Sequence, residues 1–139
     1  TVAGLTLWNG EADDGLSYLI ERAMVFNLVA GTAGSFSIWL CLHPAKMTKP
    51  TADITAIKGT AGQGYGGKAI VDTGATVVDD GWFPWDSGRG EHTVLGQVGV
   101  ALVRGHLIVP PSGGVSVNVV SNNANNTFTH GFHWYEEKL

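Results

Sequence analysis

Residues 105–120 read GHLIVPPSGGVSVNVV, and this stretch decides the fold class. An apolar run ends at Val109, and Pro110-Pro-Ser-Gly-Gly114 then supplies residues that favour a turn. Val115 to Ser121 alternates apolar and polar residues, which is the pattern of a strand with one buried face. The stretch therefore predicts strand, turn and strand, and indicates an all-β protein.

Similar patterns recur along the chain, separated by glycine, proline and amide-rich turns. Strands are predicted at residues 2–8, 24–29, 35–43, 68–71, 75–78, 92–109, 115–121 and 127–136. Two readings stay open for residues 17–26, which also suit a helix. Gly96, Gly99 and Gly105 are expected to mark breaks or bulges in the long strand at 92–109.

About eight short strands with turns every 8–12 residues are typical of a sandwich or barrel. The prediction is one antiparallel β-sandwich, jelly-roll-like, that spans residues 1–139 as a single domain. The last strand is rich in aromatic residues, so we expect it inside a sheet, with its rings in the core or at a subunit contact.

Charge is sparse: 14% of residues are charged and the net charge is −4. Without a basic run, nucleic acid is not an expected partner. The apolar run at residues 94–109 is interrupted by polar residues, so no membrane span is expected, and the chain shows no signal-peptide pattern. The single cysteine, Cys41, lies in an apolar run and is expected to be a buried thiol. A surface with so few charges suits association with another protein surface.

Gly62-Gln-Gly-Tyr-Gly-Gly-Lys68 has the glycine spacing of a phosphate-binding loop. Ala69 follows where that motif needs Ser or Thr to hold Mg²⁺, and the next residues indicate a strand rather than a helix. We therefore expect a glycine-rich loop and no nucleotide, cofactor or metal site.

Asp72-Thr73-Gly74 resembles the active-site turn of retroviral-type aspartic proteases, in which two aspartates from two chains share a proton. The flap and the second motif of that family are poorly matched. The alternative is a β-turn in which Asp72 accepts backbone hydrogen bonds and Gly74 has a positive φ. No catalytic residue is assigned, and the protease remains a second alternative.

Aromatic and acidic side chains concentrate between residues 79 and 91. The binding candidates there are Trp82, Phe83, Trp85, Asp80 and Asp86, on a predicted surface loop that also includes Asp79 and Glu91. Rings beside carboxylates suit a protein interface, stacking on a sugar, or a cation held by oxygen ligands. An interface is the preferred interpretation, and a glycan contact is the alternative.

Across most of its length the chain resembles the small jelly-roll decoration or cement proteins of tailed phages. The resemblance lies in short Gly-Thr-Val strands, low charge, one free Cys, the Val109-Pro-Pro-Ser-Gly-Gly-Val-Ser-Val117 corner and the aromatic last strand. It also includes Ser37-Ile-Trp-Leu-Cys-Leu-His-Pro44 with the Met-Thr-Lys-Pro loop that follows.

The resemblance implies a virion structural protein without enzymatic activity, made in the host cytoplasm. Its partners would be the major capsid protein and its own copies, with a homotrimer favoured. The closest alternative is a glycan-binding or receptor-binding jelly-roll module of a virion tail.

Overall fold

The computed structural model describes residues 1–29, 34–51, 54–90 and 98–139. Its strands are β1 (Leu5–Asn9), β2 (Ser17–Val29), β3 (Gly34–His43), β4 (Ala69–Asp72), β5 (Trp82–Gly90), β6 (Val98–Val109), β7 (Gly114–Ser121) and β8 (Thr127–Glu137). They form a five-stranded sheet, β4-β1-β7-β3-β5, and a three-stranded sheet, β6-β2-β8, and every pairing is antiparallel. The predicted all-β sandwich is confirmed.

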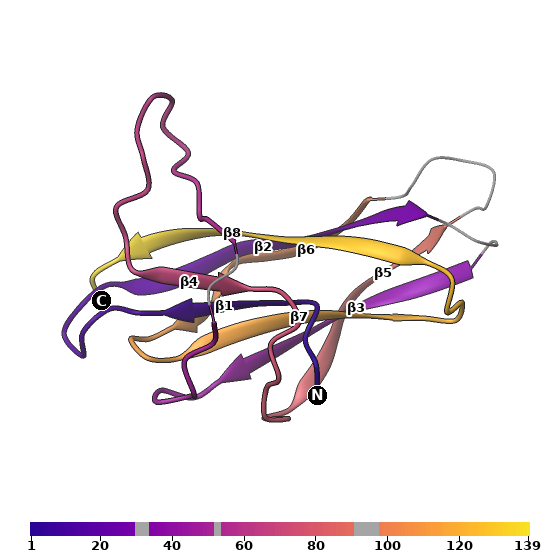
Figure 1. Cartoon of the computed structure of the whole chain (residues 1–139), viewed down its shortest axis with the longest axis horizontal. Helices are drawn as coiled ribbons and strands as arrows, with labels where there is room; N and C mark the ends of the chain where they lie inside the picture. The colour runs from indigo at the N-terminus through magenta and orange to yellow at the C-terminus, as the bar shows by residue number, and fades with distance from the viewer. Residues whose placement is uncertain (30–33, 52–53, 91–97) are drawn as a thin grey trace.

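The two sheets lie as layers, and the chain passes between them at β1–β2–β3 and again at β6–β7–β8 (Figure 1). This alternation between layers is jelly-roll-like. One crossing lies at residues 110–114, the predicted turn, where the chain leaves β6 in one sheet and enters β7 in the other.

The core between the sheets is built by alternate residues of each strand. It consists of Leu5, Leu7, Tyr18, Ile20, Ala23, Val25, Phe36, Ile38, Leu40, Val71, Ala101, Val103, Val109, Val115 and Val117. Rings of β8 (Phe128, Phe132 and Trp134) pack against this cluster from the side. The layers approach closely at Gly99, where a Cβ would lie 2.8 Å from Ile38 Cδ1.

β2 is longer than predicted, and its whole length is strand, so the helical reading of residues 17–26 was wrong. The register against β6 and β8 shifts between Ile20 and Arg22. Tyr18 and Ile20 point into the core before this shift, and Ala23 and Val25 do so after it. The irregularity breaks the period-two pattern in the sequence, which is why that stretch also suited a helix.

Three other predictions need correction. Residues 82–90 form β5, an edge strand, and not a surface loop. Residues 75–78 make only an isolated bridge, Val2 to Thr76. β8 lies at the edge of its sheet and not inside it, although its rings do reach the core.

The predicted irregularity of the long strand is found at Gly105. Arg104 and Gly105 have φ values of 54° and 73°, where Ile20 pairs with Leu107 and Arg22 with Leu102. The predicted start of that strand, with Gly96, lies outside the described residues, as does Glu91. Gly99 is a regular member of β6, paired with Val25.

Candidate functional site

The binding residues predicted around β5 do not share one surface. Trp82 pairs with Cys41 on the outward face of the five-stranded sheet, whereas Phe83 and Trp85 pack against the core. The indole of Trp82 donates to Asp79 Oδ1 at 2.8 Å, and that of Trp85 donates to the Leu102 carbonyl at 2.9 Å. The alternation of a strand separates the rings that a loop would have brought together.

The two predicted acids are also apart. Asp86 is exposed and caps the backbone N–H of Ser87 at 2.7 Å. Asp80 bonds instead to His43, at the end of β3. Two of the five residues hydrogen-bond to other strands, Asp80 to His43 and Trp85 to the Leu102 carbonyl. The five residues therefore do not form a single binding surface.

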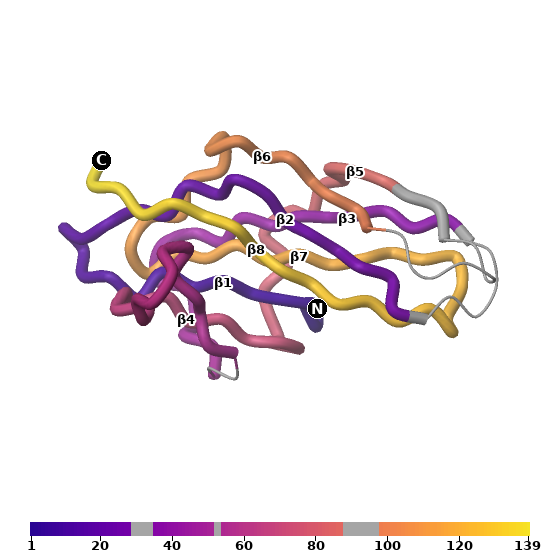
Figure 2. The backbone as a smooth tube through the Cα atoms, turned by 90° about the horizontal axis from the view of Figure 1, so that it is seen from above, coloured from indigo at the N-terminus to yellow at the C-terminus, as the bar shows by residue number. Residues whose placement is uncertain are grey.

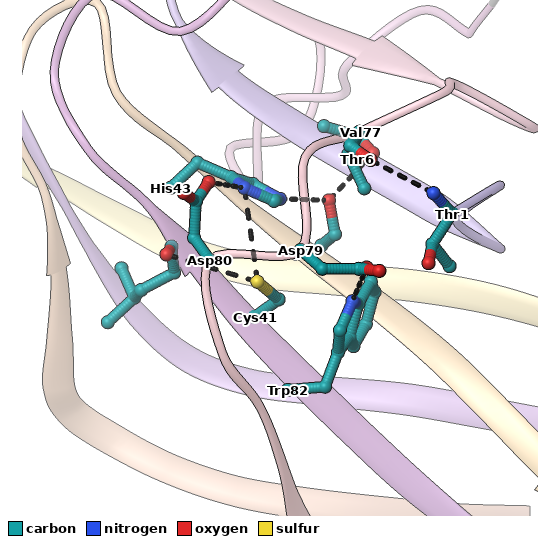
Figure 3. A network of polar contacts seen from close by, with 10 residues as sticks. Thr1, Thr6, Cys41, His43, Val77, Asp79, Asp80 and Trp82 are labelled. Carbon is teal, nitrogen blue, oxygen red and sulfur yellow. Dashed lines mark hydrogen bonds and ion pairs between the residues drawn. The ribbon is translucent and has the colours of Figure 1, made fainter.

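Asp80 is the outer member of a chain of polar groups (Figure 3). His43 Nδ1 lies 2.8 Å from Asp80 Oδ2, and His43 Nε2 lies 2.8 Å from Ser116 Oγ. Ser116 Oγ lies 2.9 Å from Thr6 Oγ1. Because a carboxylate only accepts, Nδ1 carries a proton towards Asp80. When the ring is neutral, Nε2 accepts from the Ser116 hydroxyl, and Ser116 Oγ accepts from Thr6.

The order Asp80–His43–Ser116 is that of a hydrolase triad, with each ring nitrogen facing the partner that such a triad requires. Ser116, however, has no exposed surface, because it sits within β7 beneath the segment that leads into β5. A cavity of about 240 Å³ is lined by His43 and Asp80, but Ser116 does not reach it. In this conformation the group links β1, β3, β7 and the 73–80 segment rather than reaching a substrate.

Cys41 shares this face and is buried, as predicted. Its Sγ lies 3.9 Å from His43 Nδ1. Burial is the main reason that the pKa of this thiol is raised; the backbone hydrogen bond at Asp80 works in the opposite direction. A buried thiol with a raised pKa is a poor nucleophile.

The two segments that resemble catalytic motifs, residues 62–68 and residues 72–74, lie in a loop and a turn. Gly74 has a φ of 71°, as the β-turn interpretation predicted, and its N–H bonds to the Ala3 carbonyl at 3.1 Å. Asp72 ends β4 beside Thr6 and is 8% exposed. Residues 62–68 form an extended loop that leads into β4 without a helix, so the phosphate-loop interpretation lacks its helix N-terminus.

The outward face of the three-stranded sheet is apolar at one end. Cross-strand pairing sets Met24 beside Val100 and Phe26 beside Val98. We use the name apolar face for six residues of β2 and β6: Met24, Phe26, Leu28, Val98, Val100 and Leu102. Three of its members have about half of their surface exposed or more: Leu28 (50%), Val98 (60%) and Leu102 (49%). Arg22 and His133, whose side chains meet at 3.3 Å, bound it towards the middle of the sheet.

Among the residues that the structure describes, no group of three or more His, Cys, Asp or Glu side chains is arranged to hold a metal ion. Within the same ranges, no helix has the length and apolarity needed to cross a membrane.

Comparison with known proteins gives no match: no protein family model, no curated protein and no solved structure is matched by the chain. The residues themselves are therefore the basis on which a function is assigned.

Proposed function

We propose that the chain is a non-enzymatic structural module that associates with copies of itself through the apolar face. The observation that carries the proposal is the exposure of Leu28, Val98 and Leu102 on one end of one sheet face. Clustered exposed apolar side chains on a soluble surface mark sites of association, whereas single ones are ordinary.

The neighbouring edge favours packing face to face over pairing edge to edge. β6 is an edge strand, and the Trp85 indole bonds to its Leu102 carbonyl. That contact removes an acceptor with which another strand would pair, so lengthening of the sheet past β6 is hindered there. The apolar side chains beside it remain available to a second copy.

The resemblance to phage decoration proteins supplies the rest of the proposal: a homotrimer on a virion surface, with the major capsid protein as partner. Cyclic assembly would let several copies contact the capsid together, so that weak contacts add to a strong attachment. Low charge supports this role, because burying the surface then requires little desolvation of charged groups.

A pair of matched substitutions tests the assembly. Leu102→Lys places a charge in the apolar face, and Val120→Lys places one on the outward face of the other sheet, where Val120 is 57% exposed. In sedimentation velocity, Leu102→Lys is expected to shift the assembly to monomer and Val120→Lys to leave it unchanged. Equal behaviour of the two variants would overturn the proposed surface.

The genes that lie beside the gene for this chain provide a separate test of the capsid partner. Genes for virion structure, among them a major capsid protein, are expected beside it. A neighbourhood of metabolic or secretory genes would refute the virion role and leave the association through the apolar face to stand on the sedimentation result.

A further inference from the structure

A cavity of about 650 Å³ lies between the segment 57–67 and the C-terminal end of β8. In Figure 1 the chain before β4 rises past this end of β8, and Figure 2 shows the two beside each other from above. Five consecutive residues, Phe132 to Glu136, line one side, and Tyr65, Gly66 and Gly67 are among those that line the other. The volume is within the range of small-molecule sites.

Aromatic rings form much of the wall. Tyr135 is 57% exposed, and its ring centroid lies 5.4 Å from that of His133. Tyr65 and Trp134 meet edge to face, with centroids 6.2 Å apart. These rings offer flat apolar surfaces to a ligand that has both apolar faces and polar edges.

The residues that supply the rings also hold the polar side chain of Glu136 in the cavity lining. Glu136 Oε1 accepts from the Trp134 indole at 3.1 Å and from the Tyr65 hydroxyl, so both donors use one oxygen of the carboxylate. The hydroxyl of Tyr18, a residue with no exposed surface, has no hydrogen-bond partner of normal geometry among the described residues. Burial raises the pKa of Tyr18, and Tyr65, Glu136 and Glu11 raise it further. The Tyr18 ring centroid lies 6.1 Å from that of Trp134, which lines the cavity.

Backbone groups add to this set, because β8 is an edge strand. The free edge of a strand presents unpaired N–H donors and C=O acceptors. A ligand that matches them must both donate and accept hydrogen bonds, as a sugar hydroxyl does and a quaternary ammonium group does not. Residues of the 57–67 segment form the opposite wall, and the cavity is partly open to solvent.

The charges of the lining indicate which sugars fit. Glu11 and Glu136 contribute two carboxylates, and Lys58 contributes one cation. Lys58 Nζ bonds to Gln63 Oε1 at 2.6 Å, which directs it to its own loop. An anionic sugar would therefore meet a net negative lining and be disfavoured.

We propose that the cavity between residues 57–67 and the end of β8 binds a neutral saccharide of about two rings. The proposal is independent of the assembly through the apolar face, since Arg22 and His133 separate Tyr135 from that face.

Two glycines of one loop provide a blocking variant and its control. Added Cβ atoms at Gly64 and Gly66 meet no atom within 4 Å, and neither residue has a positive φ. Gly66 lines the cavity and Gly64 does not. Gly66→Leu is therefore expected to fill the site without disturbing the fold, while Gly64→Leu changes the same loop outside it.

The experiment is a glycan array followed by NMR titration of the intact chain with lactose, cellobiose, maltose and N,N′-diacetylchitobiose, each to about 10 mM, which detects millimolar dissociation constants. Sialyllactose and choline chloride serve as anionic and cationic counterparts. We expect at least one neutral sugar to shift the Trp134 indole and the amides of residues 132–136. Gly66→Leu should abolish the binding, and Tyr135→Ala should weaken it by about three- to tenfold.

Gly64→Leu and Trp82→Ala should bind as the unmodified chain does. The proposal is overturned if no neutral saccharide binds, if only sialyllactose or choline binds, or if Gly66→Leu retains the affinity of Gly64→Leu. Folding of each variant is checked by its amide spectrum outside the loop, and its sedimentation should be unchanged, which keeps this test separate from that of assembly.

Discussion

The outward faces of the two sheets differ in polarity and in exposure to solvent. On the five-stranded sheet, Thr6, Ser116 and His43 are polar but buried, because the 73–80 segment covers them and Asp80 completes their hydrogen bonds. On the three-stranded sheet, Leu28, Val98 and Leu102 are apolar but exposed. One face has its cover within the chain, and the other lacks one in the described residues. Whether the outward side chains of a sandwich strand are exposed therefore depends on the segment that covers them as well as on their polarity.

Substitutions on the covered face are expected to destabilise the fold, whereas those on the apolar face are expected to affect association. His43→Ala is expected to have the largest effect on the fold. It removes the ring that joins Asp80 to Ser116 and leaves a buried hydroxyl short of a partner, at a cost of about 3 kcal/mol in the free energy of unfolding. Urea denaturation measures this loss, with the exposed His106→Ala as control. A cost equal to that of the control would show that the covered network does not stabilise the fold.

Asp80→Ala is a smaller break in the same network. Its side chain is 27% exposed, so solvent replaces part of the lost interaction, and about 1 kcal/mol is expected. The 73–80 segment should also open more often, which exposes Cys41. Alkylation of Cys41 by iodoacetamide under native conditions should therefore be faster in Asp80→Ala than in Asp86→Ala, whose carboxylate lies elsewhere. Equal alkylation rates would contradict the covering role.

How far the sequence predicts these two faces can be followed strand by strand. The apolar runs that became β3 and β7 were recognised because Pro44 and the residues 110–114 end or begin them. β5 was missed because Pro84 and Asp86-Ser87-Gly88 carry turn signals, and at the edge of a sheet a proline is tolerated. Pairing with β3 decides the matter, and that pairing is not visible in residues 82–90 alone.

The candidate sites were harder to predict for a physical reason. Asp80, His43 and Ser116 are distant in sequence and meet only through the order of strands. Polar residues at alternate positions of β3 and β7 were the available signal, but they suit an exposed face equally well. The cavity at β8 depends on where a glycine-rich loop lies, which neither periodicity nor turn chemistry fixes.

The pH dependence of the free energy of unfolding tests the core, through a histidine that lies on neither outward face. His130 points inward from β8, and burial lowers its pKa from the usual 6.5. A histidine with a lowered folded-state pKa contributes stability above its unfolded pKa, and that stability is lost as the pH falls below about 6.5. The free energy of unfolding should decline from pH 7 to 5, and less steeply in His130→Gln. Parallel pH curves for the two proteins would contradict the buried, neutral state of His130.

The smallest effect on the fold is expected for Leu102→Lys. Leu102 is about half-exposed, so the free energy of unfolding of the isolated chain should change by less than about 0.5 kcal/mol. Denaturation of a dilute sample, in which assembly is absent, provides the measurement. A large loss would mean that Leu102 serves the fold itself and that the apolar face is less exposed than its position on β6 indicates.

We expect another copy of the chain to cover the apolar face. The mass of the native assembly tests it most directly, by light scattering of the unmodified chain at micromolar concentrations and above. A multiple of 14.6 kDa is expected, which is three times this mass for the favoured trimer. A species of 14.6 kDa at every concentration would contradict it.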